Sequence, residues 1–211
     1  NSAFIEASPA VTSQLNLNWE RHFSGLSNTA DNSFIIKDGA LYVLHNEILE
    51  KINHDSGETV WNFKIINSNI QYTLRTHASL LFLTPRDIRH PILALSAQTG
   101  EVIYRFNRTK DMSPLTFFQD YGLINNNGIL EAYSLSTGKL AWKKKLRLKP
   151  NSQLIQTNDF IIGQLSSGEL AAIDPQELRT LWKTRPCLLT RKLSVNKTSL
   201  LATQNVRDHD G

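Results

Sequence analysis

The sequence predicts an all-β protein built from repeated four-stranded antiparallel sheets, and two observations lead to that prediction. Short apolar runs alternate with turn sequences along nearly the whole chain. An aromatic residue closes each group of runs, at successive spacings of 42, 43, 38 and 40 residues, in the series Trp19, Trp61, Tyr104, Trp142 and Trp182. This period is typical of the four-stranded blades of a β-propeller.

The composition is that of a globular protein with a core, because 40% of the 211 residues are apolar and 20% are charged. The net charge of +4 is mild, so no nucleic-acid partner is predicted. Cys187 is the only cysteine, which excludes an internal disulfide, a cysteine redox pair and a cysteine zinc site. No apolar run approaches the roughly 20 residues of a membrane helix, so no membrane span is predicted.

Residues 1–14 are small and polar and include a proline, so a flexible N-terminal segment is predicted there, followed by a propeller domain over 15–211. The chain begins at Asn1 without a basic-then-apolar signal segment, as expected of a processed mature form or an excised domain. Leu15 to His22 alternates apolar and polar residues around Trp19 and is predicted to be one strand of a partial blade.

The first full unit covers approximately residues 20–61 and ends at Trp61. Its Asp38-Gly39 and Ser56-Gly57 turns contain glycine, which adopts the positive φ of tight turns at no steric cost. The predicted strands are Ser33–Lys37, Ala40–Leu44, Glu47–Asn53 and Glu58–Ile65.

The second unit, approximately residues 62–104, ends at Tyr104 and has Thr99-Gly100 at the corresponding turn. A longer proline-containing loop, which extends to His90, separates its two middle strands. The predicted strands are Tyr72–Thr76, Ser79–Thr84, Pro91–Ser96 and Glu101–Asn107.

The third and fourth units cover approximately residues 105–142 and 143–182, and a partial unit covers 183–211. Strands of the third are predicted at Thr116–Gln119, Tyr121–Asn125, Ile129–Leu135 and Lys139–Leu146. Those of the fourth are predicted at Gln153–Gln156, Phe160–Gly163, Glu169–Asp174 and Arg179–Thr184. The partial unit contains two more predicted strands, Arg191–Val195 and Ser199–Thr203.

A short motif recurs in register before the aromatic residue. A turn-forming residue lies eight positions earlier in each full unit, at Asn53, Ser96, Ser134 and Asp174. A Ser/Thr-Gly pair follows in three units, whereas the fourth has Glu177-Leu178. The pattern Ala-x-(Asp/Ser)-x-x-Thr-Gly-(Lys/Glu)-x-x-(Trp/Tyr), found at Ala94 to Tyr104, at Ala132 to Trp142 and in part at Ala172 to Trp182, resembles the tryptophan-docking repeat of quinoprotein-like, PQQ-type β-propellers.

That resemblance covers nearly the whole chain from Leu15. In the family the terminal aromatic docks against the next blade, while a small residue and the Thr-Gly turn let neighbouring sheets approach closely. The resemblance therefore implies a structural docking role for Trp19, Trp61, Tyr104, Trp142, Trp182, Gly57, Gly100 and Gly138. If the tryptophans dock in this way, Trp61, Trp142 and Trp182 are expected to be largely buried.

A PQQ dehydrogenase would also need a cofactor floor, a calcium site and an acidic base, and none of these maps onto a motif in this sequence. Asp174 stands at the repeat's own aspartate position, which favours a turn-stabilising role over a catalytic one. The histidines lack metal-ligand spacing, and Cys187 has no predicted base partner. No catalytic residue, metal ligand or cofactor is predicted, and PQQ and calcium are expected only if the chain is part of an enzyme. The six histidines are His22, His45, His54, His77, His90 and His209.

The densest basic cluster consists of Lys143, Lys144, Lys145, Arg147 and Lys149. Lysines on an outermost strand commonly block edge-to-edge aggregation, and this interpretation is favoured over a surface for an anionic partner. Two sequences, beginning at Asn107 and Asn196, fit the N-glycosylation acceptor pattern, which matters only in a secretory protein.

Repeats without an assignable catalytic set predict a non-enzymatic scaffold that binds another protein in an extracytoplasmic compartment: periplasm, cell surface or ER lumen. The alternative is a fragment of a PQQ-dependent quinoprotein oxidoreductase whose cofactor-binding blades lie outside these residues.

The two chain ends carry complementary parts of one blade, so closure as a five-bladed ring is one prediction. Membership of a larger ring of seven or eight blades is favoured, because a strand is still missing from the composite blade.

Overall fold

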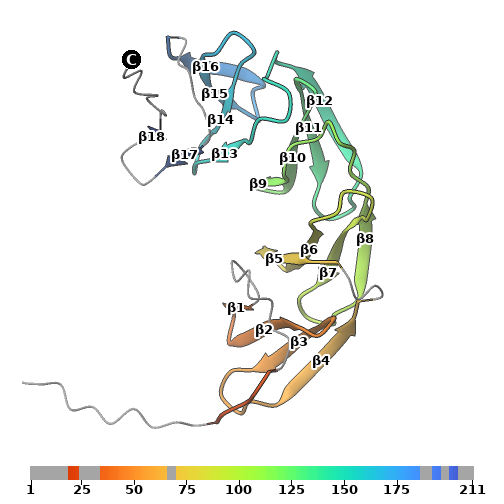
Figure 1. Ribbon diagram of the computed structural model, residues 1–211. Coiled ribbons are helices and arrows are strands. Elements are labelled where there is room, and N and C mark those ends of the chain that lie inside the picture. The colour runs from red at the N-terminus through yellow and green to blue at the C-terminus, as the bar shows by residue number, and fades with distance from the viewer. Residues whose placement is uncertain (1–18, 24–33, 66–69, 186–191, 196–199, 204–211) are drawn as a thin grey trace, which may run out of the picture. The chain divides into compact units, whose positions relative to one another are not determined.

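The computed structural model describes residues 19–23, 34–65, 70–185, 192–195 and 200–203 (Figure 1). The chain divides into two compact units, Asn1–Ser68 and Asn69–Gly211. In the described part, regular structure consists of β-strands, and no helix long and apolar enough to cross a membrane is present. The predictions made for residues 1–14, Cys187, Asn196 and His209 lie outside the described residues.

The first unit contains one sheet, in which each strand pairs antiparallel with the next in chain order. Both faces of this sheet carry buried side chains, Ala40 and Leu49 on one and Val43 and Ile52 on the other. This first sheet consists of β1 (Phe34–Lys37), β2 (Ala40–His45), β3 (Ile48–Asn53) and β4 (Thr59–Lys64).

The second unit contains three more four-stranded antiparallel sheets and one strand pair. The second sheet is β5 (Tyr72–His77), β6 (Leu80–Pro85), β7 (Ile92–Ser96) and β8 (Val102–Phe106). The third sheet is β9 (Thr116–Phe118), β10 (Tyr121–Asn126), β11 (Ile129–Ser134) and β12 (Leu140–Lys145). The fourth sheet is β13 (Ile155–Gln156), β14 (Ile161–Gln164), β15 (Leu170–Asp174) and β16 (Arg179–Lys183). The strand pair is β17 (Lys192–Val195) and β18 (Leu200–Thr203).

Apolar side chains between consecutive sheets form the core of the second unit. Phe82 and Ala94 of the second sheet pack with Leu135, which follows β11 of the third. Leu123 and Ala132 of the third sheet share a second cluster with side chains of the fourth, including Ile161 and Ala171. The three sheets therefore pack face to face in chain order, which buries faces that an isolated sheet would expose to water.

The same irregularity occurs in every full sheet. The pairing of the third and fourth strands shifts register by a bulge beside Lys51, Ala94, Ala132 and Ala172. Each of these residues pairs with the terminal aromatic of its unit, so the extra residue lies immediately before that aromatic. One bulge therefore sets the direction of each aromatic ring.

The predicted strands of the four full units are all present, with ends within two residues of those expected. Leu15 to His22 differs: its described part, from Trp19, belongs to no strand ladder. Residues 19–23 are held to the first sheet by side chains instead, as described below.

Candidate functional site

The contacts between a terminal aromatic and the next turn, here called docking joints, are the sites at which the sequence-predicted residues come together. At the first joint, Trp19 lies flat against Gly57, and a Cβ atom added to Gly57 would be 2.7–3.0 Å from three atoms of the indole ring. Gly57 has φ +71°, so a side chain is disfavoured there both by backbone conformation and by the ring. The indole Nε1 donates a hydrogen bond to the backbone oxygen of His54 at 2.7 Å.

Tyr104 and Gly138 form a second joint of the same kind, between the second and third sheets. A Cβ atom at Gly138, where φ is +68°, would overlap the phenol ring. Burial raises the pKa of Tyr104 to about 12. Phe106, two residues later, packs edge-on against Tyr133 with ring centroids 4.5 Å apart. The second joint is therefore mainly apolar.

The other predicted docking residues lie in less complete arrangements. Trp61 and Trp142 are half-buried, but Trp182 is 39% exposed, so the prediction of a largely buried ring is wrong for Trp182. Its ring rests edge-on against Phe160, the residue before β14, which leaves much of the indole in solvent. Gly100 has the expected positive φ, +77°. That these residues hold neighbouring sheets together stays a prediction.

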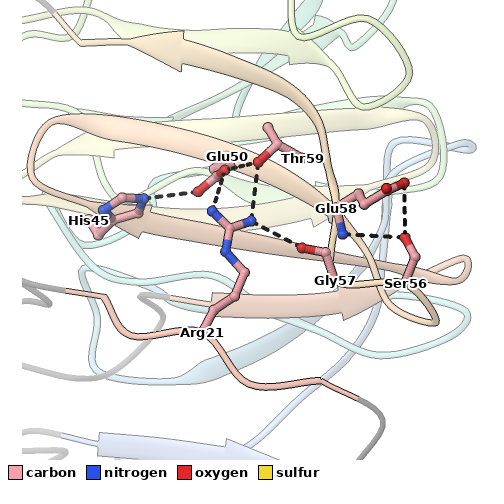
Figure 2. Close-up of polar contacts among 7 residues, drawn as sticks. All are labelled: Arg21, His45, Glu50, Ser56, Gly57, Glu58 and Thr59. Carbon is pink, nitrogen blue, oxygen red and sulfur yellow. Dashed lines mark hydrogen bonds and ion pairs between the residues drawn. The ribbon is translucent and has the colours of Figure 1, made fainter.

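The first joint continues into a polar cluster that the sequence did not reveal (Figure 2). The Glu50 side chain is only 8% exposed and accepts a hydrogen bond from Arg21 Nη2 at 3.0 Å. The Thr59 hydroxyl also donates to Glu50, and it accepts a hydrogen bond from Arg21 Nη1 at 3.1 Å. His45 Nε2 lies 3.2 Å from the other Glu50 oxygen and must be its donor if the carboxylate is ionised. Arg21 Nη1 also donates to the backbone oxygen of Gly57 at 3.3 Å.

Burial alone would raise the pKa of Glu50, but hydrogen bonds from Thr59, Arg21 and His45 outweigh it, and the net effect is a pKa below the ordinary value. The carboxylate is therefore held in its charged form. A buried carboxylate that is fully hydrogen-bonded positions its partners well, but loss of one partner leaves a desolvated charge.

Three alternate side chains of residues 19–23 face the first sheet. Trp19 lies on the turn glycine and Arg21 enters the polar cluster. Phe23 packs against the ring of His45 with centroids 4.9 Å apart, and the Arg21 guanidinium lies 5.4 Å from the centre of the Phe23 ring. The segment is thus extended across the sheet without joining its hydrogen-bond ladder.

The side chains of the predicted basic cluster are all exposed, and one of them has a contact in the next turn. Lys144, two residues after Trp142, donates to the backbone oxygen of Leu178 in the next turn. Arg21 stands in the same relation to Trp19 and Gly57, so Lys144 has a structural contact of the same kind. Lys143, Lys145, Arg147 and Lys149 are exposed, and Arg147 has φ +55°.

Asp174 has the predicted turn-stabilising contacts, because one carboxylate oxygen accepts hydrogen bonds from the backbone N–H groups of Gln176 and Glu177. Asn53 and Ser96 accept the equivalent pairs in their turns. Within the described ranges, no group of three or more His, Cys, Asp and Glu side chains could hold a metal ion.

Two histidines, His45 and His77, make defined side-chain contacts instead of lying free on the surface. His45 belongs to the polar cluster, with its side chain only 16% exposed. His77 stacks on Phe117 with centroids 5.0 Å apart, and its Nε2 lies 2.6 Å from the backbone oxygen of Gln119. His22 and His54 are exposed beside acidic neighbours, and His90 lies in the loop before β7. The residues that sequence reasoning missed are therefore Arg21, His45, Glu50 and Thr59; a cation two positions after the aromatic was the one available signal.

A family model described as "Outer membrane protein assembly factor BamB" matches residues 45–206 of the chain. No curated protein matches.

Solved structures share the fold. The crystal structure of BamB from Moraxella catarrhalis is 17% identical, with a TM-score of 0.52, over 77% of this chain and 51% of that one. The computationally designed Ika8 protein is 11% identical, with a TM-score of 0.54, over 80% of this chain and 54% of that one. The chain thus spans about half the length of these propellers, and its sheets match their blades.

Proposed function

Because the chain belongs to the family of the outer membrane protein assembly factor BamB, we propose that it is a non-enzymatic propeller scaffold that binds another protein in an extracytoplasmic compartment. The observation that carries the proposal is the family match, which extends over residues 45–206. The name of that family supports both a role in assembly and a location outside the cytoplasm.

The arrangement of polar groups supports a scaffold. The buried carboxylate of Glu50 accepts hydrogen bonds from Arg21, Thr59 and His45, and they lower its pKa, so it is poorly suited to take a proton from a substrate. Asp174 is occupied by its own turn. The proposal includes the docking role of the repeated aromatic residues. It also includes the exposed basic residues as a subsidiary surface for an anionic partner: Lys143, Lys145, Arg147 and Lys149.

Cross-linking in the intact cell envelope tests the proposal. A photo-reactive residue at position 143 or 183, both on outer strands, should capture one reproducible protein that takes part in outer-membrane protein assembly. The same residue at position 94, buried between sheets, is the matched control and should capture nothing. Absence of any captured protein, together with reproducible oxidation of an alcohol or sugar after addition of PQQ and calcium, would refute the scaffold function and favour the quinoprotein fragment.

A further inference from the structure

We propose that the face of the first sheet which holds residues 19–23 is an exchangeable binding site for an extended aromatic-x-arginine-x-aromatic segment, and that another protein can supply that segment in place of the chain's own. We call this face the socket and define it by His45, Glu50, His54, Gly57 and Thr59. The inference rests on the proposed scaffold function, since it names where on the scaffold a partner binds and what the partner presents.

The socket has three subsites that match alternate residues of an extended chain. Gly57 gives a flat surface for an indole ring, and the His54 backbone oxygen accepts its N–H. Glu50, Thr59 and the Gly57 backbone oxygen together accept hydrogen bonds from one guanidinium group. The His45 ring gives the third, aromatic subsite.

The middle subsite selects arginine. Two separate guanidinium nitrogens are used, Nη2 at Glu50 and Nη1 at Thr59 and Gly57. An ammonium group donates from one nitrogen, so it matches these spaced acceptors less well than the planar guanidinium fork, which donates from two. A segment without the cation would leave the Glu50 carboxylate with its charge buried and short of donors.

The present occupant is held in a way that permits exchange. Among the described residues, no hydrogen bond between backbone groups joins 19–23 to the sheet, and the side chains of Trp19, Arg21 and Phe23 make the contacts. The Arg21 side chain remains 32% exposed. Detaching this segment breaks no strand ladder, so an extended segment from another protein can compete for the same subsites.

The third sheet shows why the socket is specific. Its buried carboxylate, Glu131, is already satisfied within the sheet by the Tyr133 hydroxyl at 2.7 Å and Asn126 at 3.2 Å. Phe106, which packs on Tyr133, follows Tyr104 by two residues, just as Arg21 follows Trp19 at the first joint. Glu50 also has two donors within its own sheet, Thr59 and His45, but Arg21 adds a guanidinium from outside that sheet. At the corresponding position, the second joint has the aromatic ring of Phe106.

The test uses the full chain with its own segment weakened. Trp19→Ala/Arg21→Ala empties the socket, and Arg21→Gln is a milder variant in case the double variant unfolds. The probe is a fluorescein-labelled peptide with the sequence of residues 16–23, followed by fluorescence anisotropy at low salt. The emptied chain should bind at least about tenfold more tightly than the unmodified chain, in which the native segment competes.

Three controls decide what is bound. Replacing the tryptophan or the arginine of the peptide should weaken binding at least about tenfold, as removal of central aromatic and arginine anchors does. Glu50→Gln in the emptied chain should weaken it similarly, whereas Glu131→Gln, the matched buried carboxylate, should change it less than about twofold.

The inference is overturned if a folded emptied chain binds no peptide, if the unmodified chain binds equally well, or if the arginine-free peptide binds equally well. It is also wrong as stated if unmodified full-length chain occupies the emptied socket as tightly as the peptide, since the occupant is then a second copy. A chain that captures an envelope partner but ignores the peptide keeps the proposed function and loses this inference.

Discussion

The first and second docking joints have the same backbone arrangement and opposite chemistry. In both, an aromatic ring covers a glycine of positive φ, Gly57 or Gly138, in the turn between the third and fourth strands of the following sheet. Beside that contact, the first joint has Arg21 with Glu50, and the second has Phe106 with Tyr133. The repeat therefore specifies the aromatic contact, while the residue two positions later decides whether the remaining contact is ionic or aromatic.

Because of this chemical difference, the second joint mainly contributes stability and the first joint mainly contributes selectivity. An aromatic pair stabilises any neighbour of suitable shape, whereas a buried carboxylate requires one particular donor set and is costly without it. The second joint can then serve as a permanent contact within the core, and the first as one that distinguishes between segments.

The largest expected effect concerns what the joints share. Gly57→Ala and Gly138→Ala should each lower the free energy of unfolding by about 3 kcal/mol, because the new methyl group meets a ring and the backbone conformation disfavours it. Urea melts followed by tryptophan fluorescence measure this, with Gly39→Ala as control, since Gly39 has φ +67° but nothing near its Cβ position. A loss at Gly57 or Gly138 no larger than at Gly39 would contradict the ring contact.

Removing the variable residue should be less severe. Arg21→Ala should cost about 2 kcal/mol, a value reduced because Arg21 is partly solvated, and Phe106→Ala a similar amount through lost packing. The two losses differ in origin: adding Glu50→Gln to Arg21→Ala should recover part of the first, but adding Glu131→Gln to Phe106→Ala should recover none of the second. A double-mutant cycle measures these couplings.

The first joint should lose its contribution to stability at acid pH, and the second joint should lose its contribution at alkaline pH. Glu50 has a lowered pKa, so its stabilisation is complete above the ordinary value of 4.5 and is lost as pH falls through the folded-state pKa. Tyr104 has its pKa raised from 10.0 to about 12, so its stabilisation is complete below pH 10 and is lost as pH rises towards 12.

The free energy of unfolding, measured as a function of pH, checks both the acid and the alkaline prediction. Glu50→Gln should reduce the loss of stability at acid pH and leave the alkaline loss unchanged. Tyr104→Phe should reduce the loss of stability at alkaline pH and leave the acid loss unchanged. Tryptophans of one unit can be observed separately by replacing Trp142 and Trp182 with phenylalanine. An acid limb unchanged in Glu50→Gln would show that the carboxylate contributes nothing.

The smallest effect is that of salt. Raising the ionic strength to about 1 M should weaken the first joint by about 0.5 kcal/mol, because its ion pair is partly exposed, and should leave the second unchanged. Salt-dependent melts of the unmodified chain and of Arg21→Gln give the comparison, and equal salt dependence in the two proteins would contradict the ionic contribution of Arg21.

Sequence reasoning located the sheets because the turns are local. Asn53, Ser96 and Asp174 each accept two N–H groups within their own turn, so spacing along the chain was sufficient to find the strand ends. The Arg21–Glu50 pair could not be predicted from the sequence, because its residues are 29 positions apart and meet only when residues 19–23 lie on the first sheet. Trp182 was misjudged because periodicity identifies a docking residue without showing how much of its ring is covered.

Leu178 shows which part of the repeat can be lost. It stands where the other units have glycine, yet it keeps φ at +52°, and Asp174 still closes the turn through Gln176 and Glu177. The capping side chain and the bulge are therefore sufficient to hold this conformation, at a modest cost in backbone strain. Counting blades in this chain by the Ser/Thr-Gly pair alone would therefore miss the fourth unit, whereas the eight-residue interval between cap and aromatic finds all four.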